Sequence, residues 1–259
     1  MENVSGSRIE ISASSVIGTR RKQQDSYVYF RTDKGSLACV CDGMGGLSGG
    51  ERSSALCTRM LAEDFLREAP LCAPSDFFGW ESDKLDEAVS SLRTEAGEPL
   101  GSGTTIVAVY LEEKDDRYNM SWLSVGDSRI YVLRNGHIDC IVREHNYRAV
   151  LNSLLRKGSI TPEKYRIEQF KGEALTSYLG MGGLTLRDIS HEPLPLIEGD
   201  FILLCSDGLY RAMSDDMIAA VIEDNSFDTE RAANELVRTA SELSDRGQDN
   251  TTAVLVSYR

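Results

Sequence analysis

Two stretches of the chain, residues 104–111 and Phe201–Cys205, are apolar on both faces. A strand with no polar face has to be covered on both sides in the folded protein. Several shorter predicted strands accompany them, and Asn135-Gly136 joins two of these with a strong two-residue hairpin signal. Consecutive strands joined by short turns favour antiparallel pairing. The sequence therefore predicts an α+β fold, in which two antiparallel sheets pack face to face and helices cover the outside.

The periodicity of apolar residues predicts nine strands and four amphipathic helices, plus one irregular helical segment. The predicted strands are 9–14, 27–30, 37–41, 104–111, 118–125, 129–133, 137–142, 201–205 and 252–256. The predicted helices are 51–67, 77–96, 214–223 and 228–243. Residues 146–169 are expected to form a helical insertion that Gly158 and Pro162 interrupt.

Four aspartates lie where an apolar strand meets a tight turn. Asp42 and Asp207 follow such strands, Asp127 comes after the strand that ends at Val125, and Asp249 precedes the last strand. A carboxylate at the end of a buried strand is unfavourable unless a positive group compensates it. If the four ends converge, their oxygens would suit Mg²⁺ or Mn²⁺. The pattern predicts a catalytic metal site.

Two further segments have the residue types of a phosphate or metal site. Asp42 leads into a glycine-rich loop, where the backbone can approach a ligand closely, so the Gly43 carbonyl could bind a metal ion. An ordinary glycine-rich turn is an equally good interpretation of that loop alone. Arg20 lies in a basic cluster five residues before Asp25, and its planar guanidinium suits a phosphate, although a solvated turn is the alternative.

Length and composition restrict the class of protein. The chain has 259 residues and a formal net charge of −13, which disfavours nucleic acid and anionic membranes as partners. We expect one domain over residues 1–259, with neither a secretory signal nor a membrane span. The six cysteines include no CxxC pair and are typical of a reducing compartment, so a cytoplasmic protein is expected.

In combination, these segments resemble the metal-dependent protein phosphatases, the PPM or type 2C serine/threonine phosphatases, and their bacterial-type members in particular. Seven motifs follow one another in the order of that family, and together they span the chain. They are Arg20 with Asp25, the block 40–46 with Gly50-Glu51, Ser102-Gly103-Thr104-Thr105, the block 125–131, the block 175–180, the block 204–209, and Asp249-Asn250-Thr251-Thr252.

The resemblance implies a fold and a cofactor. The fold is a four-layer αββα sandwich of two packed antiparallel sheets flanked by helices. The cofactor is a pair of Mn²⁺ or Mg²⁺ ions, with a weaker third ion in bacterial-type members. By motif, Asp42 bridges the two ions, the Gly43 carbonyl binds one of them, and Asp207 and Asp249 hold the other.

The resemblance also implies roles around this centre. Asp25 acts on the metals through a bound water, Asp127 holds the third ion together with Asp207, and Arg20 binds the substrate phosphate. Asn250 orients its neighbour Asp249. A water shared by the two metals attacks the phosphorus of phosphoserine or phosphothreonine in line with the leaving oxygen.

Two positions depart from the family pattern. Gln24 stands where a glutamate is usual, so weaker affinity at one metal is expected rather than loss of the site. Met44 stands where eukaryotic members often have a histidine, so the residue that protonates the leaving group is unassigned. A variable flap is expected beside the active site at about residues 146–171.

The expected function is hydrolysis of phosphoserine and phosphothreonine on proteins by a monomeric enzyme. A serine/threonine kinase and its targets are the expected partners. One alternative is a catalytically silent member of the family that acts as a regulatory binding module. Another is a two-metal hydrolase acting on nucleic acid or on a small phosphate ester, and the net charge disfavours nucleic acid.

Overall fold

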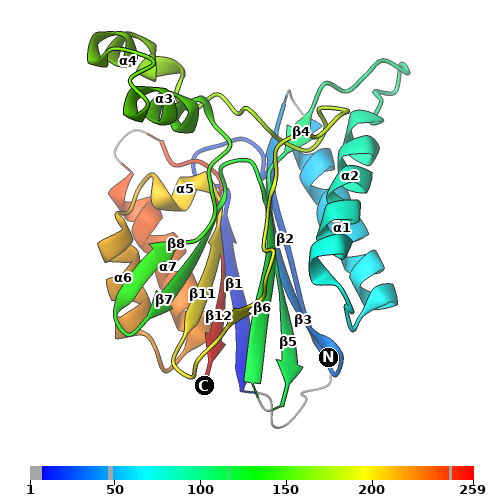
Figure 1. The fold of residues 1–259 in the computed structure, drawn as a ribbon, viewed down its shortest axis with the longest axis vertical. Helices are drawn as coiled ribbons and strands as arrows, with labels where there is room; N and C mark the ends of the chain where they lie inside the picture. Colours follow the sequence, from blue (N-terminus) through cyan, green and yellow to red (C-terminus); the bar gives the residue numbers. More distant parts are fainter. Residues whose placement is uncertain (1–7, 46–48, 116, 245–246) are drawn as a thin grey trace.

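The structure is a computed structural model, and it describes residues 8–45, 49–115, 117–244 and 247–259. Its centre consists of two antiparallel sheets packed face to face (Figure 1). The first sheet has the order β1 (Ile9–Val16), β12 (Thr251–Tyr258), β11 (Phe201–Cys205), β7 (Arg129–Arg134), β8 (His137–Cys140). The second has the order β10 (Leu194–Pro195), β6 (Arg117–Val125), β5 (Ile106–Lys114), β3 (Gly35–Met44), β2 (Asp25–Thr32), with β4 (Gly103–Thr104) beside β3 and β9 (Asp188–Ile189) beside β6.

Helices cover the outer face of each sheet, which confirms the predicted four-layer αββα sandwich (Figure 1). The second sheet is covered by α1 (Gly49–Glu68) and α2 (Pro74–Ser90). The first is covered by α5 (Asp207–Tyr210), α6 (Asp215–Asp224) and α7 (Thr229–Leu243). A flap of α3 (Tyr147–Arg156), α4 (Pro162–Glu168) and the 3₁₀ turn η1 (Gln169–Lys171) projects from one end. No helix in the described ranges combines the length and apolarity that crossing a bilayer requires.

The two entirely apolar strands lie in the middle of the layers. In β11, Ile202 and Leu204 pack between the sheets, whereas Leu203 and Cys205 pack against the helices. Both faces of such a strand are buried, so alternation with polar residues would leave unpaired polar groups inside the protein. Each large apolar side chain buried in this way stabilises the fold by roughly 1.5–3 kcal/mol.

Two predicted boundaries are wrong for reasons that lie outside the local sequence. Strand β3 does not end before Asp42 but continues to Met44, because β4 pairs with Gly43 and Met44. Helix α2 ends at Ser90 rather than at residue 96. The apolar spacing continues beyond Ser90, but the chain turns back there and the amide of Thr94 donates to the Glu98 carbonyl at 2.8 Å.

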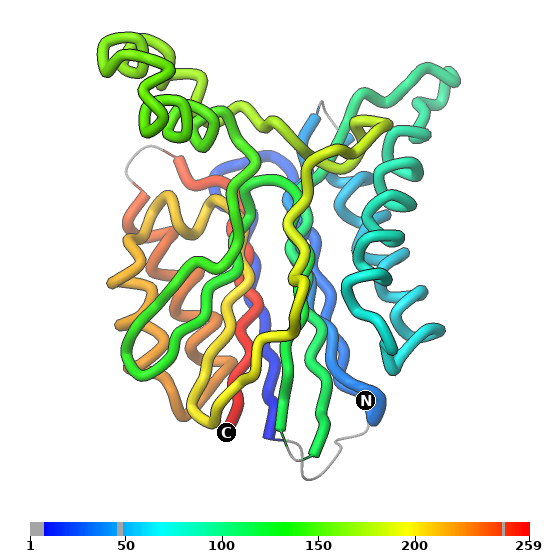
Figure 2. The backbone as a smooth tube through the Cα atoms, viewed as in Figure 1, coloured from blue at the N-terminus to red at the C-terminus, as the bar shows by residue number. Residues whose placement is uncertain are grey.

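The chain after η1 crosses the top of the sandwich, from the side of the flap to the side of α2 (Figure 2). On the way, Leu179 and Thr104 exchange two backbone hydrogen bonds of 2.9 and 3.0 Å. The carboxylate of Asp86 on α2 then accepts hydrogen bonds from backbone amides that follow Leu179, beginning with the Gly180 amide at 2.7 Å from Oδ1. This crossing segment therefore connects the flap, the short strand β4 and helix α2.

A buried glutamate between the helices and the second sheet makes stability depend on pH. Both carboxyl oxygens of Glu81 on α2 are buried, and neither has a hydrogen-bond partner among the described residues. Burial, followed by the negative charge of Asp64, raises the pKa of Glu81 to about 8. The folded protein therefore binds this proton more tightly than the unfolded chain does. The stabilisation that the folded protein gains from protonating Glu81 is fully present below pH 4.5, and it is lost as the pH rises to about 8.

We expect Glu81→Gln to raise the free energy of unfolding by roughly 1–3 kcal/mol at pH 8 and to change it little at pH 4.5. Glutamine has nearly the same shape and never carries the buried charge. Denaturant unfolding at several pH values measures the effect, and Glu87→Gln on the exposed face of α2 is the matched control. A parallel pH dependence in the Glu81→Gln variant and the native protein would contradict the assignment.

Candidate active site

Five aspartates that are far apart in the sequence converge at the end of the sandwich where α5 and β4 lie (Figure 1). Two of them face each other across a strand pair, since Asp25 in β2 stands opposite Asp42 in β3. Asp127 follows β6, Asp207 begins α5 directly after β11, and Asp249 precedes β12. All four of the aspartates predicted from strand ends are therefore brought together, and Asp25 joins them.

Asp42 is the centre of this cluster. Its burial in the protein, followed by the negative charges of Asp25 and Asp207, raises the pKa of its carboxyl well above the usual range. Its backbone is fixed by the next strands: the amide donates to the Thr105 hydroxyl at 3.0 Å, and the carbonyl accepts from the Thr104 hydroxyl at 2.9 Å. These two threonines thus position the residue that carries the central carboxylate.

Asp25 is buried and only half satisfied. Its Oδ2 accepts hydrogen bonds of 2.7 Å from the hydroxyls of Ser206 and Thr252. Its Oδ1 is buried with no hydrogen-bond partner in the described part of the chain. Burial raises the pKa of Asp25, and the nearby charges of Asp207 and Asp249 raise it further. A buried carboxylate oxygen without a partner is unfavourable unless a cation or a water completes its surroundings.

Asp207 and Asp127 share one arginine, Arg211 of the chain just after α5. Its Nη2 lies 2.9 Å from Asp207 Oδ2 and 3.6 Å from Asp127 Oδ2. Burial, together with the charge of Asp207, raises the pKa of Asp127 to about 6, although Arg211 opposes that shift. Burial also raises the pKa of Asp207. Arg211 was not anticipated from the sequence, because no local pattern marks its contact with Asp127.

Asp249 and Arg20 form an ion pair across the site. Arg20 Nη2 lies 2.5 Å from Asp249 Oδ2, and both side chains are accessible to solvent. Asn250 holds the segment that carries Arg20, because its side-chain amide donates to the carbonyls of Ile17 and Lys22 at 2.9 and 3.0 Å. It also contacts Asp249, but through its backbone amide, which donates to Oδ1 at 2.8 Å. Arg20, the predicted phosphate-binding residue, therefore lies at the site, where it is paired with Asp249, a predicted metal ligand.

Gly43 lies where the backbone leaves no room for a side chain. A Cβ atom there would come within 2.2 Å of the Gly50 carbonyl oxygen and 2.6 Å of the Gln24 carbonyl oxygen. Gln24, at the position that departs from the family pattern, donates from its side chain to the Gly45 carbonyl at 3.3 Å. Gln24 thus contacts the start of the glycine-rich loop through this hydrogen bond. Residues 46–48 of that loop lie outside the described residues.

His145 is a buried residue that contacts the turn carrying Asp127. Its Nδ1 accepts a hydrogen bond of 3.1 Å from the Gly126 amide, and its own amide donates to the Gly126 carbonyl at 2.8 Å. Burial lowers the pKa of the imidazole, which therefore stays neutral in its acceptor role. His145 fixes the turn that carries Asp127, and it links this turn to the start of the flap.

The donors at this end of the sandwich are of the kind that Mg²⁺ and Mn²⁺ prefer, namely several carboxylates on rigid strand ends. The unpartnered Oδ1 of Asp25 fits a cation site as well. Over the residues that the structure describes, however, no three His, Cys, Asp or Glu side chains are arranged to hold an ion as they stand. Arg20 and Arg211 instead engage Asp249, Asp207 and Asp127 in ion pairs.

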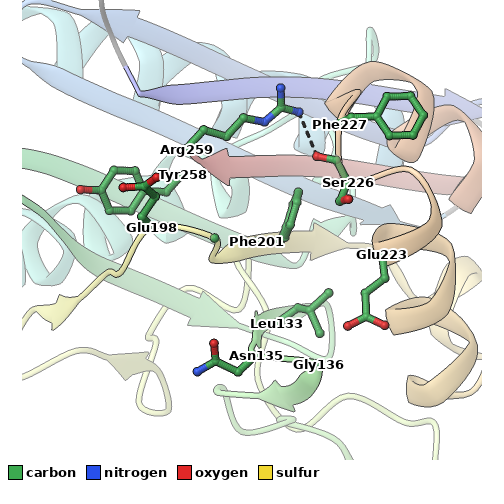
Figure 3. Close-up of a pocket in the computed structure, with 11 residues that line it drawn as sticks. Leu133, Asn135, Gly136, Glu198, Phe201, Glu223, Ser226, Phe227, Tyr258 and Arg259 are labelled. Atoms are coloured by element: carbon green, nitrogen blue, oxygen red, sulfur yellow. Dashed lines mark hydrogen bonds between the residues drawn. The ribbon is translucent and has the colours of Figure 1, made fainter.

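A pocket of about 720 Å³ lies at the opposite end of the sandwich from the aspartates (Figure 3). The β7–β8 turn at Asn135 and Gly136 and the first residue of β11, Phe201, line it. Arg259 also lines it and donates from Nη2 to the Ser226 carbonyl at 3.1 Å. Strands β7, β11 and β12 run from the aspartates to this pocket, so the two places are a strand length apart and the pocket is not part of the candidate site.

Comparisons with known proteins match nearly the whole chain. A family model described as protein phosphatase 2C matches residues 14–255. The serine/threonine phosphatase stp of Listeria innocua serovar 6a is 27% identical over 232 residues, which cover 88% of this chain and 87% of that protein. Among solved structures, the S. agalactiae serine/threonine phosphatase has a TM-score of 0.81 at 27% identity and covers 97% of this chain and 100% of its own.

A further solved structure holds metal ions. It is the catalytic domain of the serine threonine protein phosphatase PstP in complex with two manganese ions. Its TM-score is 0.74 at 25% identity, and the likeness covers 96% of this chain and 97% of that one.

Proposed function

The chain belongs to the protein phosphatase 2C family, and on that premise we propose that it hydrolyses phosphoserine and phosphothreonine on proteins with a pair of divalent metal ions. The observation that carries the proposal is the convergence of five aspartates, in which the carboxyl of Asp42 is surrounded by four others. A cluster of this kind needs cations to be stable in its charged form. The solved PstP structure with two manganese ions supports Mn²⁺ for this chain too, and Mg²⁺ has the same preference for oxygen ligands.

Asp42, the Gly43 carbonyl, Asp207 and Asp249 are the proposed ligands, with Asp25 acting through water. When bound, a pair of divalent ions supplies a water of lowered pKa and positive charge for the phosphoryl oxygens. Arg20 leaves Asp249 in this proposal, because the same carboxylate oxygen serves either the guanidinium or a metal.

The chain's own residues orient the substrate and the ligands. Arg20, once released, binds the phosphate of the substrate through its planar pair of N–H donors. The hydroxyls of Ser206 and Thr252 hold one oxygen of Asp25, and the other oxygen has no partner among the described residues and is free to bind a metal-bound water. Thr104 and Thr105 keep the backbone of Asp42 in place while charge changes at its carboxylate.

We propose that the substrate protein lies in the groove beside the flap. This groove has a volume of about 1140 Å³ and is lined by α3 and by the segments around β8 and β9. Five basic side chains line it against three acidic ones, and this excess would suit an acidic phosphopeptide: Arg129, Arg143, Arg156, Lys157 and Arg187 against Glu144, Asp188 and Asp215. Arg129 also lines the groove and connects it to the site, because its guanidinium lies 3.7 Å from the centroid of the Tyr210 ring and the Tyr210 hydroxyl donates to the Asp127 carbonyl.

The remaining parts of the proposal concern the whole protein. Residues 1–259 act as one catalytic domain with a flap at about 146–171, and the enzyme works as a monomer on substrates of a serine/threonine kinase. It acts in the cytoplasm, which is supported by six cysteines that are all free thiols.

Release of phosphate from a phosphothreonine peptide tests the function. We expect release with Mn²⁺ that falls at least about tenfold when the metal is chelated, and slower release from a small ester such as p-nitrophenyl phosphate at equal concentration. No release from folded protein under either condition would favour the silent binding module. In that case Gln24→Glu, which restores the usual acidic residue, is the variant to assay next.

We expect Arg20→Ala to raise the KM for the phosphopeptide about tenfold or more and to lower kcat much less, since a hydrogen bond to a charged group contributes about 1.5–3 kcal/mol. Steady-state kinetics at saturating Mn²⁺ measure this, and the exposed neighbour Arg21, changed to alanine, is the matched control. A fall in kcat at constant KM would instead place Arg20 on the transition state.

A further inference from the structure

Arg211 is the one arginine in the described ranges whose ion pairs combine two of the five aspartates with a carboxylate next to the flap. Its Nη2 reaches Asp207 Oδ2 at 2.9 Å and Asp127 Oδ2 at 3.6 Å, and it also forms an ion pair with Glu173. Glu173 lies two residues after η1, where the chain leaves the flap. One positive charge thus sits among three negative ones that come from three separate parts of the chain.

This geometry disagrees with a third metal ion on Asp127 and Asp207. Besides Glu173, Arg211 Nη2 lies against one oxygen of each of these two carboxylates, so the guanidinium and an ion would compete for those oxygens. A doubly charged ion placed there would also lie within a few ångströms of the positive charge of Arg211, which is unfavourable. Arg20 differs from Arg211, because Arg20 forms one ion pair, with an accessible carboxylate, and can be released from it.

We propose that Arg211 takes the place of the third ion in this protein and ties the flap to Asp207. The proposal rests on the proposed two-metal function. Arg211 supplies the positive charge that Asp127 and Asp207 need, and it does so at any metal concentration.

The tie to the flap continues beyond Glu173. Arg148 in the first turn of α3 forms an ion pair with the same carboxylate, and its backbone amide donates to the Gly172 carbonyl at 3.0 Å. The series Arg148, Glu173, Arg211, Asp207 therefore connects the first helix of the flap to a proposed metal ligand through charged contacts. In this proposal the flap is held at the site by ion pairs between side chains of the chain itself.

The number of Mn²⁺ ions bound by the full chain tests the proposal. We expect the native protein to bind two ions in a calorimetric titration extended to millimolar Mn²⁺, and Arg211→Ala to bind a third, weaker one. A native count of three overturns the role of Arg211 and leaves the proposed function intact. A native count below two overturns the two-metal function itself. A count of two in the Arg211→Ala variant also overturns the replacement.

Two other variants keep the test decisive. If no ion uses Asp127, as proposed, Asp127→Asn binds the same two Mn²⁺ ions as the native protein. If the proposal is wrong, this variant binds one ion fewer than the native protein. Asp127→Asn therefore replaces Arg211→Ala as the test if Arg211→Ala does not fold. Arg238→Ala on α7 is the matched control, since Arg238 also forms ion pairs with two carboxylates but lies on an exposed helix face away from the site.

Hydrogen exchange tests the connection to the flap separately from metal binding. We expect residues 147–173 to exchange about tenfold faster in both Arg211→Ala and Glu173→Gln than in the native protein, with Arg238→Ala unchanged. Glu173→Gln should leave the count of Mn²⁺ ions at two. Equal exchange of the flap in the native protein and these two variants would overturn the tie.

Discussion

Asp42→Asn is expected to lower the kcat of phosphopeptide hydrolysis by about a thousandfold or more, because a metal ion contributes several kcal/mol of charge stabilisation and about 1.4 kcal/mol corresponds to a factor of ten. Asparagine has nearly the same volume but no charge, and it removes the carboxylate around which the other four are arranged. The backbone hydrogen bonds to Thr104 and Thr105 do not depend on that charge. The fold should therefore persist while the proposed metal centre is lost.

Steady-state kinetics with a phosphothreonine peptide and a parallel Mn²⁺ titration measure the effect of Asp42→Asn. Thermal unfolding without added metal should show a protein at least as stable as the native one, because the substitution relieves repulsion among buried carboxylates. Asp33→Asn at the exposed β2–β3 turn, the other end of the same strand pair, is the control. Unchanged turnover in the Asp42→Asn variant would contradict both the metal ligands and the proposed chemistry.

The sequence was sufficient to predict the layers because their signal is local. Strands apolar on both faces need cover on both sides, and β5 and β11 lie at the centre of their sheets with cover on each face. The hairpin at Asn135-Gly136 is confirmed, and both residues have the positive φ angles, 52° and 77°, that this type of turn requires. The apolar stripe of 228–243 is confirmed as α7, which Asp228 caps through its side chain.

Four of the five aspartates could also be found from sequence, because each lies at the end of an apolar strand; the role of Asp25, within β2, came from the resemblance alone. What holds them could not be found in this way. Arg211 forms ion pairs with Asp127 and Glu173, which belong to two other parts of the chain, and Arg20 pairs with Asp249 across a separation of 229 residues. Such contacts depend on how the sheets pack, and no spacing along the chain encodes them. The extension of β3 beyond Asp42 has the same origin, since its partner β4 is about sixty residues away.

Asp86 is a second example, and its contacts lead to a strong prediction. It is a buried carboxylate on α2, and the amides of four residues in the crossing segment donate to its two oxygens. The distances are 2.7 Å from Gly180, 3.2 Å from Gly182, 2.7 Å from Gly183 and 3.1 Å from Leu184. One side chain thus satisfies four backbone donors, in a segment with no regular secondary structure.

We expect Asp86→Ala to lower the free energy of unfolding by roughly 3–5 kcal/mol, because it leaves the four amides without their acceptor and each such loss costs about 1–3 kcal/mol before relaxation. For a chain of this length the melting temperature should fall by about 10 °C. Activity should fall as well, since the crossing segment pairs through Leu179 with Thr104, whose hydroxyl holds the Asp42 carbonyl. Thermal unfolding and phosphopeptide turnover at a temperature where the variant is folded measure the two effects.

The matched control is Asp83→Ala, one turn earlier on the same helix. Asp83 forms an ion pair with Arg187 at 2.6 Å, but its side chain is exposed, so its loss should cost less than about 1 kcal/mol. The melting temperature of Asp86→Asn should lie between those of these two variants. The asparagine amide offers one oxygen as an acceptor, and its NH₂ group faces the backbone amides that the second carboxylate oxygen had satisfied. Equal melting temperatures for Asp86→Ala and Asp83→Ala would show that the crossing segment is held by its pairing with β4, and that Asp86 contributes little to the position of Asp42.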